Sequence, residues 1–62
     1  MTESQIGEYQ ELININLNKI KRQVNQIEPG GGNEERLEII REILEATNSI
    51  INLMLIQERK HK

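Results

Sequence analysis

The sequence has no cysteine, tryptophan or phenylalanine, and Tyr9 is its only aromatic residue. Without cysteine the chain can form no disulfide, and one histidine cannot supply the ligand set of a structural zinc site. A chain of 62 residues buries only about 60% of the surface that it exposes when unfolded, so its stability is marginal without added support. Self-association is the support that remains for so small a domain.

The residues that carry most enzyme chemistry are scarce or poorly placed. His61 is the only imidazole and lies in a charged C-terminal segment, where nothing would bury or orient it as a general base. Neither Ser4 nor Ser49 has a histidine or lysine at helical contact distance. The glycine run lacks the lysine and the flanking strand of a phosphate-binding loop. We therefore expect no enzyme, no cofactor and no metal site.

Long hydrophobic runs are missing as well. The longest apolar-rich stretch, residues 50–56, is interrupted by Asn52 and is far shorter than the roughly 20 residues of a membrane-spanning helix. The first five residues lack the basic-then-apolar order of a signal peptide. The formal charge of −2 gives no general attraction to nucleic acid or to an anionic membrane. We expect a cytoplasmic protein without a membrane span.

Proline and most of the glycine are concentrated at the midpoint, in residues 29–32. Pro29 disfavours helical backbone at Glu28, and the three glycines that follow accept most backbone dihedrals. Asn33 is a favourable N-cap, and the two glutamates after it suit the positive end of a helix dipole. The sequence therefore predicts a turn over residues 29–33 between two helices. A run of three glycines also occurs in artificial linkers that join two natural segments, and both origins stay open.

A seven-residue repeat of apolar side chains predicts a helix over residues 3–28. Four isoleucines take heptad position d, and position a is apolar in its last two turns. The d residues are Ile6, Ile13, Ile20 and Ile27, and the a residues are Gln10, Leu17 and Val24. Residues 13–18 also alternate as a strand would, but asparagine is a poor strand former and the heptad continues on both sides.

A second repeat predicts a helix over residues 34–59, followed by a basic tail over residues 60–62. Its a residues are Leu37, Leu44 and Ile51, and its d residues are Ile40, Thr47 and Met54. Further apolar residues at positions c and g widen this stripe to about 160° of the helix, which is more than one partner helix covers. The basic tail suits the negative end of the helix dipole.

The two helices predict an all-α fold, an antiparallel helical hairpin with coiled-coil-like packing that makes one domain of residues 1–62. One register, in which paired residue numbers sum to 64, places every d residue opposite an a residue of the other helix. It pairs Ile20 with Leu44 and Leu17 with Thr47. It also places the basic end of the first helix beside the acidic start of the second, although each surface ion pair contributes only about 0.2–1 kcal/mol.

A lone hairpin buries too little apolar surface to offset the roughly 1.5 kcal/mol of conformational entropy lost by each ordered residue. We therefore expect a homodimer in which two hairpins form a four-helix bundle, with a trimer as the alternative. The expected oligomer interface consists of the c and g residues Ile39, Ile43, Ile50 and Leu53. Four apolar residues do not fit the bundle and are the candidate surface for another protein: Leu12, Ile15, Leu55 and Ile56.

The first functional hypothesis is a non-enzymatic, self-associating helical module that acts in protein–protein interaction, oligomerisation or regulation. The second is a trimeric six-helix core of the fusion type, whose two segments are joined by an artificial glycine linker. The third is a small nucleic-acid-associated regulator that uses Lys19, Lys21 and Arg22 or the basic tail. We favour nucleic acid least, because no aromatic residues are interleaved with these cations and acidic residues flank them.

Overall fold

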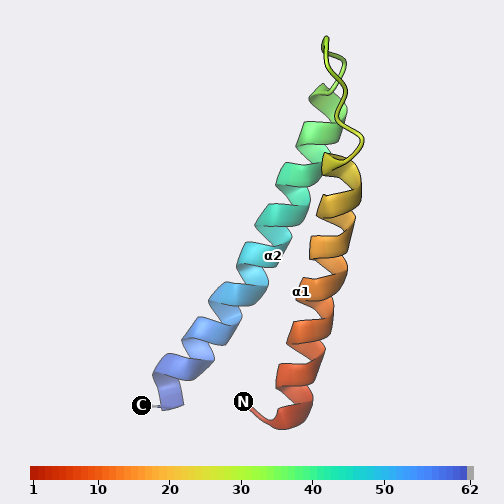
Figure 1. Cartoon of the computed structure of the whole chain (residues 1–62). Helices are drawn as coiled ribbons and strands as arrows, with labels where there is room; N and C mark the ends of the chain where they lie inside the picture. The colour runs from red at the N-terminus through yellow and green to blue at the C-terminus, as the bar shows by residue number, and fades with distance from the viewer. Residues whose placement is uncertain (62) are drawn as a thin grey trace.

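The computed structural model describes residues 1–61 and shows two helices that pack against each other as a hairpin (Figure 1). Helix α1 spans Glu3–Val24 and helix α2 spans Glu34–His61. The helices lie side by side and antiparallel, so both ends of the chain lie opposite the turn (Figure 1). The Cα framework measures 50 × 17 × 12 Å, which is a single layer of helices. The predicted all-α helical hairpin is confirmed.

Helix α1 begins with a capping box. The Thr2 hydroxyl accepts from the Gln5 N–H at 3.1 Å, and the Gln5 side-chain oxygen accepts from the Thr2 N–H at 3.0 Å. Two N–H groups that the helix itself cannot satisfy are paired in this way. Thr2 and Gln5 have the three-residue spacing of this motif, so the helix start is encoded locally.

Helix α1 ends at Val24, four residues before the predicted end at Glu28. Beyond Val24 the backbone tightens, because Gln26 N–H donates to the Gln23 carbonyl at 3.1 Å and Ile27 N–H to the Val24 carbonyl at 3.2 Å. These bonds span three residues instead of four, as in a 3₁₀ turn. The connection between the helices is therefore longer than the predicted turn over residues 29–33.

The turn is closed by an amide clamp and by three glycines. The Asn33 side chain donates to the Glu28 carbonyl at 2.7 Å and accepts from the Glu28 N–H at 3.0 Å. Gly30, Gly31 and Gly32 have φ angles of 94°, 106° and 78°, which residues with a Cβ rarely adopt. The Asn33 carbonyl accepts from Leu37 N–H at 2.8 Å, as in an N-cap, but its side chain closes the turn.

Helix α2 runs two residues past its predicted end at residue 59 and takes in part of the predicted basic tail. Lys62, the last residue of that tail, lies outside the described residues. Neither helix, over the residues described, combines the length and the apolar character of a membrane span.

The contact between the helices, which we call the seam, uses positions d and g instead of the predicted d and a. The protected side chains recur at alternating spacings of three and four residues. They are Ile6, Tyr9, Ile13, Asn16, Ile20 and Gln23 of α1, and Arg36, Ile40, Ile43, Thr47, Ile50, Met54 and Gln57 of α2. Within residues 1–60, only Ile40 and Thr47 are buried, at 9% and 6% exposure.

The predicted pairing of layers is therefore wrong, because each helix faces the other with a different side than predicted. The predicted antiparallel direction is right. Leu17 and Leu44, which were expected to face Thr47 and Ile20, are 49% and 50% exposed. Asn16 takes the predicted place of Leu17 and donates to Thr47, so the observed pair sums to 63 instead of 64. Relative to the predicted packing, each helix is rotated about its own axis, so that the g side chains lie between the helices.

Candidate interaction surfaces

Two polar contacts cross the seam. Near its middle, the Asn16 side-chain amide donates to the Thr47 hydroxyl at 3.1 Å, and that hydroxyl donates to the Ile43 carbonyl at 2.7 Å. The buried Thr47 oxygen thus has both a donor and an acceptor. Burying such a group without partners would cost free energy, so the pair favours this one alignment of the helices.

The second polar contact lies beside the turn. The Arg36 guanidinium donates to the side-chain oxygens of Gln23 at 2.9 Å and Gln26 at 2.8 Å. One arginine of α2 therefore holds the end of α1 and the residue where the tightened turn starts. Both acceptors are neutral amides and not carboxylates.

A row of exposed apolar side chains lies outside the seam. Five apolar residues at position a are exposed, and together we call them the exposed stripe: Leu17 and Val24 of α1, and Leu37, Leu44 and Ile51 of α2. Each follows a seam residue at position g by one place, so each side chain is turned in the same sense about its own helix. Because the helices are antiparallel, the same sense of rotation brings both sets to one face of the hairpin.

The predicted oligomer interface is divided between two parts of the molecule. Ile43 and Ile50 are half-buried on the seam, where they share the α1-facing side of α2 with Ile40 and Thr47. Ile39 and Leu53 are exposed on the other side of the seam from the exposed stripe. The four residues therefore do not form one free surface in the hairpin.

The predicted surface for another protein is exposed throughout, at Leu12, Ile15, Leu55 and Ile56. Leu12 and Ile15 line a shallow hollow on α1 together with Glu8 and Glu11. Leu55 and Ile56 lie near the end of α2, which is the open end of the hairpin. The structure thus places the four residues in two separate patches, one on each helix.

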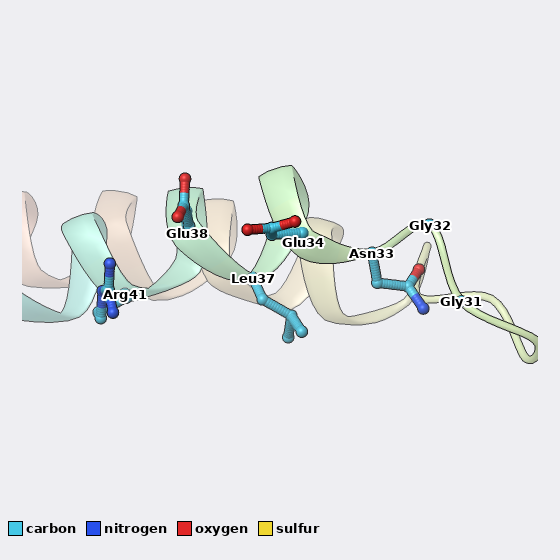
Figure 2. A pocket seen from close by; sticks show the side chains of 7 residues that line it. All are labelled: Gly31, Gly32, Asn33, Glu34, Leu37, Glu38 and Arg41. Atoms are coloured by element: carbon cyan, nitrogen blue, oxygen red, sulfur yellow. The ribbon is translucent and has the colours of Figure 1, made fainter.

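A second hollow lies beside the turn (Figure 2). Its lining consists of Gly31, Gly32, Asn33, Glu34, Leu37, Glu38 and Arg41. Figure 2 shows the Leu37 side chain extending from α2 on the other side of the ribbon from Glu38. No group of three or more potential metal-ligating side chains occurs among the described residues. Leu37, the residue of the exposed stripe that lies nearest the turn, is thus part of this hollow.

Comparison with protein-family models, with curated proteins and with solved structures finds no significant match. Function is therefore inferred from surfaces alone. Sequence reasoning missed the exposed stripe, because position a was assigned to the seam. The signal that could have located it is Thr47, a polar residue at position d that needs a partner, and Asn16 lies one place from the residue predicted to face it.

Proposed function

We propose that this chain is a non-enzymatic self-association module in which two hairpins form a four-helix bundle. The observation that carries the proposal is the imbalance of burial. Over the described residues, one apolar side chain, Ile40, is buried, whereas twelve large apolar side chains are exposed. Exposed apolar side chains that gather on one face, as the five residues of the exposed stripe do, usually mark a site of interaction.

The energetic reasoning supports a second copy as the source of the missing core. Fully burying one leucine or isoleucine stabilises by about 1.5–3 kcal/mol. Covering a side chain that is half-exposed in the hairpin would therefore add about half of that stabilisation. Two hairpins stacked face to face bury such side chains in both copies at once. The hairpin is a single layer, and stable domains are built from at least two packed layers.

Binding is proposed instead of catalysis because the dominant feature is an aliphatic surface. A module of this kind brings two chains, and whatever is joined to them, into one assembly. Its role then lies in oligomerisation, in protein–protein interaction or in regulation through either.

The mass in solution tests the proposal. Sedimentation equilibrium at micromolar concentration is expected to give twice the chain mass of 7.2 kDa. Three times that mass would favour the six-helix core of the fusion type. A helical monomer at all concentrations would overturn self-association.

A second candidate, binding of another protein, is supported by the hollow on α1. Its apolar residues Leu12 and Ile15 lie beside the carboxylates of Glu8 and Glu11, a combination that suits a basic amphipathic segment. Titration with a basic amphipathic helical peptide should give saturable binding, which Leu12→Ser combined with Ile15→Ser should remove. Equal binding by this variant would place the peptide elsewhere.

The nucleic-acid hypothesis stays a prediction. Lys19, Lys21 and Arg22 are exposed near the turn end of α1. If they contact phosphates, retention on nucleic acid should fall steeply as salt rises from about 50 to 200 mM. Retention that is absent at low salt would remove this hypothesis.

A further inference from the structure

We propose that a second copy of this chain packs on the exposed stripe, with both turns at the same end of the bundle and α1 of each chain against α2 of the other. The inference rests on the proposed self-association and adds to it the face, the direction and the matching layers.

The face is chosen by the chemistry of the two flanks of the seam. On the flank of the exposed stripe, both helices contribute aliphatic side chains: Leu17 and Val24 from α1, and three more from α2. On the opposite flank, α2 contributes Ile39, Ala46 and Leu53, but α1 contributes one apolar residue, Leu12, beside Gln5 and Lys19. A two-fold interface uses the same patch on both copies, so an apolar contact needs the flank on which both helices are apolar.

Stacking on the exposed stripe also completes the heptad. In a four-helix bundle, the a and d residues of all four helices point towards a common axis. The hairpin alone places the d residues of α1 and α2 in the seam and leaves the a residues in water, whereas Ile27, predicted at position d, lies beyond the end of α1 and is exposed. A second hairpin on this face would cover the a residues and turn the single layer into a bundle with a central core.

The direction follows from where α1 is apolar on this face. Its a residues are apolar only in the half near the turn, at Leu17 and Val24, whereas the earlier a residue is Gln10. With the turns together, Leu17 lies near Leu44 of the partner subunit and Val24 near Leu37 of the partner subunit. With the turns at opposite ends, Leu17 and Val24 would instead meet the polar half of the partner's stripe on α1, around Gln10.

The size of the face is adequate for a stable dimer. The hairpin presents a face whose Cα framework measures 50 by 17 Å. Specific protein interfaces bury about 800 Å² per partner, so a face of this extent is large enough to hold one. The proposed contact therefore needs no further segment of chain to reach ordinary size.

The face is tested by two leucines that are equally exposed. Leu44 on the exposed stripe and Leu53 on the opposite flank are both 50% exposed. Leu44→Glu would place an unpaired charge at the contact in both copies, and should raise the dimer dissociation constant more than about 100-fold. Leu53→Glu should leave it within about threefold, because surface substitutions change stability little. The reverse ranking would overturn the face and favour the flank that contains Ile39 and Leu53.

The direction is tested by crosslinking. The chain has no cysteine, so a single introduced thiol reacts only with the same residue of another copy. Val24→Cys should be joined rapidly by a short bis-maleimide, because with the turns together the two positions lie across the bundle axis. With the turns at opposite ends they would be about 30 Å apart along α1. Ile15→Cys is the matched control, since Ile15 is 43% exposed and Val24 48%, but Ile15 points away from the stripe.

The outcomes separate this inference from the proposed function. A dimeric mass for the unmodified protein with fast crosslinking at position 24 and slow crosslinking at position 15 supports both. A dimeric mass with no preference for position 24 overturns the direction and leaves self-association in place. A monomeric mass for the unmodified protein overturns both.

Discussion

The seam and the exposed stripe run parallel along the same two helices, but their chemistry differs. The seam contains two pairs of polar side chains that form hydrogen bonds across it, Asn16 with Thr47 and Gln23 with Arg36. The stripe is entirely aliphatic and exposed. Hydrogen bonds are directional, whereas burial of aliphatic surface is not.

The difference suggests a division of roles between the two surfaces. Polar pairs in the seam select one alignment of α1 and α2, at the expense of the apolar area that the seam could have buried. The stripe holds that apolar area and makes it available for association. The folded hairpin thus has a specified shape and little core, and stabilisation comes from packing a further layer on the stripe.

The division of roles is tested most strongly by shortening a buried side chain of the seam. Ile40→Ala should lower the free energy of unfolding by about 2–4 kcal/mol, because it removes buried methyl groups and leaves a cavity. Ile39→Ala, at the neighbouring residue, should cost less than about 1 kcal/mol, since Ile39 is exposed and lies off both surfaces. Urea denaturation at a fixed protein concentration measures both. Equal losses would mean that the seam does not hold the core of the hairpin.

Much of this fold was predictable from local chemistry. Pro29 and three glycines can only interrupt a helix, and the heptads on either side have equal length, so two antiparallel helices follow. The rotation of each helix was not predictable in the same way. Positions a with d and positions d with g have the same seven-residue period, and the wide stripe of α2 includes both.

What decides the rotation lies in particular side chains. The Thr47 hydroxyl donates to the Ile43 carbonyl of its own helix and can also accept from Asn16 at position g of α1, whereas Leu17 has no donor to offer it. The early end of α1 escaped prediction for a similar reason. It depends on bonds over three residues at Gln26 and Ile27, which no heptad pattern reports. The exposed stripe was missed because it is the residue set that this rotation leaves behind.

The turn offers a way to disturb the seam without touching the stripe. Gly31→Ala should cost about 1–2 kcal/mol, because φ at this residue is 106° and a side chain there is strained. An added Cβ would meet no atom within 4 Å, so the cost is in the backbone alone. Thermal denaturation measures the loss, while sedimentation should still show the mass of the unmodified protein. An unchanged melting temperature would show that the closed turn is dispensable to the seam.

The polar pair sharpens the comparison at the level of one hydrogen bond. A double-mutant cycle of Asn16→Ala and Thr47→Val should give a coupling energy of about 0.5–1.5 kcal/mol. Asn18→Ala in place of Asn16→Ala is the matched control, and its coupling to Thr47→Val should be close to zero because Asn18 is exposed. Denaturant titration of the single and double variants supplies the four free energies. Equal coupling in both cycles would remove the role of Asn16 in alignment.

The smallest expected effect comes from a change in helix propensity alone, at a residue outside both the seam and the exposed stripe. Gly7 lies inside α1, and a Cβ there would meet nothing within 4 Å. Gly7→Ala should therefore raise the free energy of unfolding by about 0.5–1 kcal/mol, since glycine loses more backbone entropy than alanine in a helix. Thermal denaturation should show the gain with the dimer dissociation constant unchanged. A loss of stability, or a weaker dimer, would mean that another chain approaches α1 closely at this glycine, and the contact would then extend beyond the stripe towards the open end.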